Sequence, residues 1–167
     1  AVGSDNRTAT YTSGSGNTQL VFRYTIQSGD NDTNGISIRA DSIVLPNNST
    51  IRDAALNDAD LTHDAVDNNT SYKVDNTPPT VSSVSITSAE GIQNGLLNTG
   101  DNVSVTATFS ETVNVDNSSG NPTLTLTVGS TPRTATYTSG SGSDDLVFRY
   151  TIQDGEIDSN GISIPAN

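Results

Sequence analysis

Carboxylates are the most abundant side chains in this sequence that could do chemistry. The chain has 19 acidic residues against seven basic ones, a single histidine and no cysteine, which gives a net charge of −12. The lack of cysteine excludes disulfides and a thiolate nucleophile, and a single histidine argues against zinc. Carboxylate, carbonyl and water oxygens are the ligands that Ca²⁺ prefers. Calcium binding is therefore the first chemistry to consider.

The same residues give little indication of an enzyme active site. His63 could be combined on paper with a serine and an aspartate, but no nucleophile elbow or similar local setting surrounds it. A glycosidase needs paired carboxylates in a cleft that can hold sugar. Aromatic residues make up only 5% of the chain and tryptophan is absent, so a sugar-stacking wall is not expected. We expect the protein not to be an enzyme.

The acidic balance also restricts the partners of the chain. Nucleic acid is bound by basic surfaces that replace its counterions, and anionic membranes attract basic segments. No run of about 18 apolar residues could span a bilayer as a helix. We expect neither nucleic acid nor direct membrane insertion.

Short alternating runs of Thr, Val, Ile and Tyr predict an all-β fold. Gly, Asn, Asp, Ser and Pro separate these runs, as is typical of many half-buried strands. The low apolar content of 31% fits strands that expose one face to water. The predicted strands are residues 81–87, 102–110, 122–128, 133–138 and 145–153, with 36–38, 42–45, 50–52 and 71–75 in the first half of the chain.

An internal repeat organises these strands. Arg-Thr-Ala-Thr-Tyr-Thr-Ser-Gly-Ser-Gly occupies residues 7–16 and again 133–142, an offset of 126 residues. Leu-Val-Phe-Arg-Tyr-Thr-Ile-Gln at 20–27 and Asn-Gly-Ile-Ser-Ile at 34–38 recur at the same offset. A period of this length indicates tandem structural repeats.

The repeat boundary is predicted at the proline pair of Asp-Asn-Thr-Pro-Pro, residues 75–79, because proline interrupts a strand ladder. Residues 1–75 are then the late part of one repeat, 76–79 a linker, and 80–167 the early part of the next. The chain is thus expected to be out of phase with its repeat. Joined into one composite unit, the two parts give at least seven short strands, which predicts an Ig-like β-sandwich.

Several motifs, in order, resemble the tandem Ig-like extender repeats of giant bacterial surface adhesins. These are the RTX-type biofilm adhesins, whose relatives include ice-binding adhesins. The resemblance rests on Pro-Thr-Val-Ser-Ser-Val-Ser-Ile-Thr at 79–87, Gly-Asp-Asn-Val-Ser-Val-Thr-Ala-Thr-Phe-Ser-Glu at 100–111, Tyr-Thr-Ser-Gly-Ser-Gly at 137–142, Phe-Arg-Tyr-Thr-Ile-Gln at 148–153, Asp-Ser-Asn-Gly-Ile-Ser-Ile at 158–164 and Ser-Tyr-Lys-Val-Asp at 71–75.

This resemblance implies a non-enzymatic structural segment at the bacterial cell surface. Such repeats form Ca²⁺-stiffened rods that project an adhesive region, so the expected partners are neighbouring repeats, with an extracellular ligand bound by other regions. One departure concerns a late loop, where the family often has Asp-Ala-Ala-Gly-Asn. Here Leu56 replaces that glycine and removes an easy route to positive φ.

Strand topology places the candidate calcium ligands near the repeat junction. A four-residue linker spans at most about 14 Å, so it should bring the exit of one repeat close to the start of the next. Asp30, Asp32 and Asp75 come from the first repeat, and Glu111, with Asp101 or Asp116, from the second. Asp158 repeats the position of Asp32. Because Asp also stabilises turns through its own backbone, turn formation is the alternative role for each of these acids.

Two other functions stay open at this stage. Strands missing from each partial repeat favour a self-assembling filament or surface-layer subunit completed by strand exchange. A carbohydrate- or peptide-binding module would instead use the loop ends.

Overall fold

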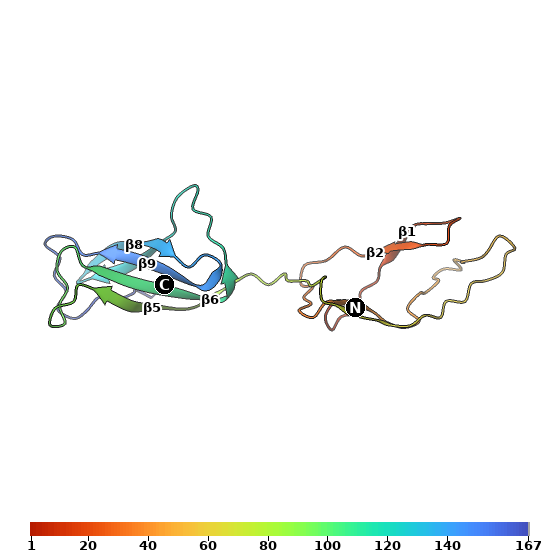
Figure 1. The fold of residues 1–167 in the computed structure, drawn as a ribbon, viewed down its shortest axis with the longest axis horizontal. Helices are drawn as coiled ribbons and strands as arrows, with labels where there is room; N and C mark the ends of the chain where they lie inside the picture. The colour runs from red at the N-terminus through yellow and green to blue at the C-terminus, as the bar shows by residue number, and fades with distance from the viewer. Residues whose placement is uncertain (167) are drawn as a thin grey trace. The chain divides into compact units, whose positions relative to one another are not determined.

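The computed structural model describes residues 1–166, which form two compact units, Ala1–Thr77 and Pro78–Asn167 (Figure 1). Antiparallel strands supply the regular structure of both units, and no helix occurs among the described residues. The prediction of an all-β fold is therefore confirmed.

The second unit contains a five-stranded antiparallel sheet in the order β5-β6-β9-β8-β7 (Figure 1). All five strands lie where the sequence predicted them, and β5 and β6 each run three residues beyond the predicted end. Their bounds are β5 (Val81–Glu90), β6 (Asn102–Val113), β7 (Thr123–Val128), β8 (Thr131–Ser139) and β9 (Ser143–Thr151).

Alternation along β6 and β9 builds the core of this unit. Val105 lies opposite Phe148 and Val103 opposite Tyr150 in the antiparallel register, and all four side chains are buried. Leu126 of β7 is also fully enclosed. These are the inward-facing residues that the period of two predicted, because alternate side chains in a strand point to the same face. Ser104, Thr106 and Thr108 lie on the other face of β6, where Ser104 is buried and the two threonines are partly exposed.

The sheet curls through the segment that follows β9. The backbone of Ser163 forms two hydrogen bonds with Thr127 of β7, and Ile162 and Ile164 pack against the core. Strand β7 itself pairs with β8 over its whole length, in the same sheet as β5, β6 and β9. In a constant-type Ig domain the third strand belongs to the second sheet. The observed fold is therefore a curled antiparallel sheet, which is a broader class than the predicted Ig-like sandwich.

The first unit has less regular structure. Strands β1 (Thr10–Ser13) and β2 (Val21–Arg23) pair with each other, as do β3 (Ile36–Ile38) and β4 (Val66–Asn69), which gives two separate two-stranded sheets.

The predicted late strands of this unit are largely wrong. Residues 42–45 and 50–51 are irregular, and Arg52 and Val74 form only isolated bridges, with Asp58 and Asp32. Asn47 and Asn48, between these two predicted strands, both adopt positive φ and turn the chain there. The strand that pairs with β3 is β4, at residues 66–69, where no strand was predicted.

Candidate functional site

The Asp158 carboxylate organises the turn after β9. Its Oδ2 accepts a 2.7 Å hydrogen bond from the Gly129 N–H, and its Oδ1 accepts bonds from Asn160 at 3.1 Å and Gly161 at 2.8 Å. The bond from Gly129 lowers the pKa of Asp158, the bonds from Asn160 and Gly161 add to this, and burial opposes it. The carboxylate thus ties the β7–β8 turn to the turn after β9.

The first unit contains the same arrangement 126 residues earlier. Asp32 is buried and accepts bonds from Gly3 at 2.7 Å, Asn34 at 3.2 Å and Gly35 at 2.7 Å. The bond from Gly3 is the main cause that lowers the pKa of Asp32. Gly3 has φ +58° and a Cβ there would lie 2.2 Å from the Asn31 carbonyl oxygen, so this donor position requires glycine.

A second buried carboxylate belongs to each unit. In the second unit Glu156 accepts hydrogen bonds from the Tyr150 hydroxyl at 2.6 Å and the Gln153 N–H at 2.8 Å, and it forms an ion pair with Arg133. Burial raises the pKa of Glu156, but the bonds from Tyr150, Gln153 and Arg133 outweigh it and hold the pKa below its usual value. Burial, with the bond to Glu156, raises the pKa of Tyr150 to about 12.

Asp30 takes the place of Glu156 in the first unit. It accepts 2.7 Å bonds from the Tyr24 hydroxyl, the Gln27 N–H and the Arg7 Nε. The Gln27 bond is the main cause that lowers the pKa of Asp30, with smaller contributions from Tyr24 and Arg7 against the effect of burial. The donors are therefore repeated while the acid changes from Asp to Glu.

Sequence reasoning missed the partners of these carboxylates. The sequence pattern assigns Arg133, Tyr150 and Gln153 only to predicted strands, and it gives no role to their first-unit copies, Arg7, Tyr24 and Gln27. The signal that could have found them is their unchanged recurrence at the 126-residue offset beside a conserved negative charge.

The other predicted calcium ligands lie elsewhere in their units. Asp75 follows the Val74 bridge to Asp32 and accepts a bond from Thr77 at 3.0 Å. Glu111 follows Ser110, whose N–H donates to the Thr80 carbonyl at 2.8 Å, so it lies where the second unit begins.

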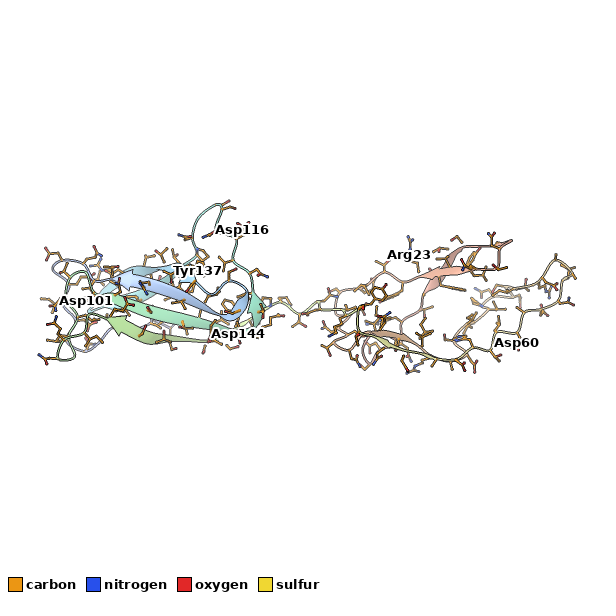
Figure 2. All side chains as sticks on the ribbon, viewed as in Figure 1. Arg23, Asp60, Asp101, Asp116, Tyr137 and Asp144 are labelled. Atoms are coloured by element: carbon orange, nitrogen blue, oxygen red, sulfur yellow. The ribbon has the colours of Figure 1, made fainter. Side chains whose placement is uncertain are left out.

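Asp101 lies at the other end of the second unit, where its Oδ2 accepts a 2.6 Å bond from Asn98 (Figure 2). Glu111 lies ten residue steps further along β6, roughly 33 Å at the usual rise. Asp116 accepts a bond from Ser118 in an exposed turn. One calcium ion cannot bind both Asp101 and Glu111 of one unit.

The five predicted ligands do not form one cation site. Both carboxylate oxygens of Asp30 and of Asp32 already accept protein hydrogen bonds, and Arg7 neutralises Asp30. These bonds fix the orientation of both carboxylates within their turns. Within the described residues no group of three or more acidic or histidine side chains is placed to hold a metal ion. Turn formation is thus the role that the geometry gives to Asp30 and Asp32.

His63 joins two loops of the first unit. Its Nε2 lies 3.3 Å from the Ser42 Oγ and 3.0 Å from the Ser42 N–H, while its Nδ1 faces the backbone carbonyl of Asp64 at 2.8 Å. The carboxylate of Asp41 accepts a bond from the His63 N–H and does not contact the ring. These contacts fasten residues 41–42 to residue 63.

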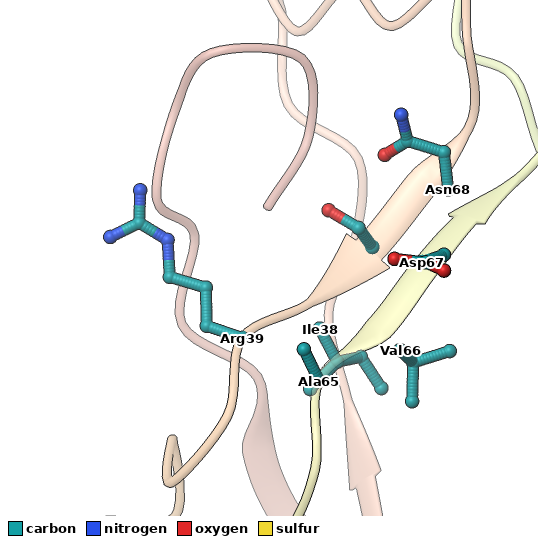
Figure 3. Close-up of a pocket in the computed structure, with 7 residues that line it drawn as sticks. Ile38, Arg39, Ala65, Val66, Asp67 and Asn68 are labelled. Carbon is teal, nitrogen blue, oxygen red and sulfur yellow. The ribbon is translucent and has the colours of Figure 1, made fainter.

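An open depression of about 400 Å³ lies beside β3 and β4 (Figure 3). Arg39, Asp67 and Asn68 contribute its polar lining, and Ile38 and Val66, both about half exposed, its apolar lining. Its walls are short, exposed strands, so it lacks the enclosure that ligand pockets usually provide.

Comparison with known proteins gives no relatives: the chain matches no protein-family model, no curated protein and no solved structure. No helix long and apolar enough to cross a membrane is present in residues 1–166.

Proposed function

We propose that this chain is a non-enzymatic extender segment of a long bacterial surface adhesin, built from tandem Ig-like β-sandwich repeats. The observation that carries the proposal is the duplicated carboxylate turn. Asp32 and Asp158 accept hydrogen bonds from equivalent backbone groups, 126 residues apart, at distances that agree within 0.1 Å.

These duplicated residues perform a structural task. In each unit, one carboxylate ties two turns together and a second holds an arginine and a tyrosine. Charge-assisted hydrogen bonds are stronger than neutral ones, so such turns resist opening under load. A module that keeps its turns closed suits a rod that transmits force between a cell and an attached surface.

The charge of the chain supports the same interpretation. A net charge of −12 keeps an extended protein soluble and discourages collapse of one segment on another. In this proposal the partners are neighbouring repeats, the location is the cell surface, and the adhesive ligand is bound by another region of the protein.

Calcium stiffening remains a prediction. Asp30 and Asp32 accept hydrogen bonds on both carboxylate oxygens, whereas the carboxylates of Asp75, Asp101 and Glu111 have one bond or none among the described residues. Of these three, Asp75 lies beside the linker and Glu111 beside Thr80. Backbone carbonyls and water would have to supply the other ligands.

Small-angle scattering on arrays of complete repeats tests the proposal. Arrays of two, four and eight repeats should give a maximum dimension that grows in proportion to repeat number. Dimensions that grow as the square root of repeat number would show a flexible chain and would contradict an extender role.

A further inference from the structure

The chain contains three Asn-Gly pairs, at residues 34–35, 94–95 and 160–161. In such a pair the glycine nitrogen can attack the carbonyl carbon of the asparagine side chain, because glycine has no Cβ to hinder the approach. The first and third pairs are copies of each other at the 126-residue offset, and the second lies between β5 and β6. One chain therefore holds the same dipeptide in different surroundings.

A carboxylate binds the glycine N–H in the two repeated pairs. Asp32 Oδ1 accepts a 2.7 Å hydrogen bond from the Gly35 N–H, and Asp158 Oδ1 accepts a 2.8 Å bond from the Gly161 N–H. The attacking nitrogen must lose this proton, and the carboxylate opposes the loss because two negative charges would then lie side by side. A charge-assisted bond also holds the nitrogen in the turn and away from the asparagine side chain.

Close packing adds to this restraint in the first copy. Gly35 is buried, and a Cβ there would lie 2.1 Å from the Asn69 carbonyl oxygen. The backbone of β4 therefore leaves little room for the peptide between Asn34 and Gly35 to rotate.

The pair at 94–95 forms the two central residues of a tight hairpin turn. Gln93 and Leu96 exchange backbone hydrogen bonds of 2.9 and 3.0 Å, and Asn94 and Gly95 adopt φ +54° and +81°, as a type I′ turn requires. Both central residues are exposed. The Gly95 N–H donates no hydrogen bond within residues 1–166, so no carboxylate restrains it there.

This turn can open without disturbing the sheet. Only the two bonds between Gln93 and Leu96 close it, and exposed loop hydrogen bonds break at a much lower free energy than those of core strands. A Cβ at Gly95 would meet no atom within 4 Å, which shows that the peptide has room to rotate. The Gly95 nitrogen can therefore reach the side chain of Asn94.

We propose that Asn94 is a site of spontaneous deamidation, and that the carboxylates of the two repeated turns protect Asn34 and Asn160 from the same reaction. The inference rests on the geometry of the turns and does not depend on adhesion or calcium.

The reaction needs only water. The Gly95 nitrogen bonds to Cγ of Asn94, its proton passes through solvent to the side-chain nitrogen, and that nitrogen leaves as ammonia. Water then adds to one carbonyl carbon of the resulting succinimide ring and breaks the bond of that carbon to nitrogen. Breakage at Cγ gives aspartate, and breakage at the main-chain carbonyl gives isoaspartate. Either product adds a negative charge, and isoaspartate also lengthens the main chain within the turn.

Peptide mass spectrometry of the full chain, incubated in a mildly alkaline buffer, tests the proposal. The mass gain on replacement of the side-chain NH₂ by OH gives the rate at each asparagine. A parallel incubation in guanidinium chloride supplies the reference, because the three unfolded pairs should react at similar rates. In the native chain we expect Asn94 to react at least about tenfold faster than Asn34 and Asn160, because its turn opens more often.

Replacing each carboxylate tests the protection. Asp158→Ala should raise the native rate at Asn160 about tenfold, because the turn is then free to open, and should leave Asn34 in the other unit unchanged. Asp32→Ala should do the reverse, so each asparagine is the control for its copy. Circular dichroism shows whether a variant is folded. If both variants unfold, the ratio of native to denatured rates in the wild-type chain still decides.

Two outcomes would overturn the proposal. A native rate at Asn94 no higher than those at Asn34 and Asn160 would remove the deamidation site. An unchanged rate at Asn160 in folded Asp158→Ala would remove the protective role of the carboxylate. Neither rate depends on repeat number, so the scattering arrays remain a separate test of the proposed function.

Discussion

The Tyr150 hydroxyl donates a 2.6 Å hydrogen bond to Oε1 of Glu156, and the same bond, at 2.7 Å, joins Tyr24 to Asp30 in the first unit. The acid is one methylene longer in the second unit, yet the tyrosine, the arginine and the backbone N–H all reach it. The donors are thus fixed by the fold, and the carboxylate adjusts to them.

Removing this hydroxyl should destabilise the second unit. Tyr150→Phe leaves the buried carboxylate of Glu156 without one donor, which should lower the free energy of unfolding by about 1–3 kcal/mol. Urea unfolding followed by circular dichroism measures this change. Tyr72→Phe is the matched control, because Tyr72 is 65% exposed and its loss should change little. Equal effects of both substitutions would show that the bond to Glu156 contributes nothing.

Stability should depend on pH through the turn carboxylates. The pKa values of Asp32 and Asp158 are lowered in the folded protein, by bonds from Gly3 and Gly129 above all. The unfolded chain then binds protons more readily, so this stabilisation is complete above about pH 5 and is lost as pH falls below the ordinary Asp pKa of about 4.

Asp158→Asn tests this pH dependence. At pH 7 we expect a loss of about 1–3 kcal/mol in the free energy of unfolding, since a charged acceptor is replaced by a neutral one. The difference from wild type should shrink as the pH is lowered from 5 to 2. Asp144→Asn, at an exposed position, is the control. A difference that stays constant between pH 7 and pH 2 would contradict the assigned role of the charge.

Leu56 stores strain in an exposed loop. It adopts φ +68° and is 73% exposed, while Asp53 holds the loop by accepting bonds from the Ala55 and Asn57 N–H groups. Leu56 therefore adopts a positive φ without glycine, in a loop that hydrogen bonds between Asp53 and Asn57 close.

Leu56→Gly should relieve that strain. A left-handed residue other than glycine costs about 1–2 kcal/mol, and the added freedom of the unfolded chain offsets about 0.5–1 kcal/mol. We expect a net gain of about 0.5–1 kcal/mol in unfolding experiments. Leu56→Ala removes the same side chain without relieving the backbone and should give no gain. A stabilisation by alanine as large as that by glycine would point to the side chain instead.

We expect calcium to stabilise the chain through Asp75 and Glu111. Extracellular modules bind Ca²⁺ with dissociation constants of about 10⁻⁴–10⁻³ M, so 10 mM calcium should stabilise the wild-type chain by about 1.4–2.7 kcal/mol. The double variant Asp75→Asn, Glu111→Gln should lose this response, whereas Asp144→Asn should keep it. Thermal melting with calcium and with EDTA measures both, and a wild-type melt that EDTA leaves unchanged would remove calcium from the proposal.

The period of two predicted the strands of the second unit well, because each of these strands pairs with a neighbour in one five-stranded sheet. Val103 and Val105 follow a period of two and lie beside Tyr150 and Phe148 of the neighbouring strand β9. The same reading failed for the late strands of the first unit, because strand formation at residues 42–45 depends on partners that the local sequence does not contain. The identical copies at β2 and β9 show this dependence within one chain.

The position of the acidic turns was predictable from the sequence, and so was turn formation as one role of their acids, but the hydrogen-bond donors were not. Composition pointed to the acidic turns, and Asp32 and Asp158 do occupy equivalent places. Their function as hydrogen-bond acceptors depends on Gly3 and Gly129, which are separated from them by 29 residues and which only the fold brings close. The length of β6 likewise puts Asp101 and Glu111 at different ends of one unit.

The central claim is that the 126-residue repeat is a mechanical module, and pulling a single molecule that contains several complete repeats tests it most directly. Each repeat should unfold as one event and release roughly 400 Å of chain, since 126 extended residues span about 450 Å before the folded length is subtracted. The number of equal events should match the number of repeats. Extension without discrete events, or with lengths unrelated to the repeat, would contradict the account.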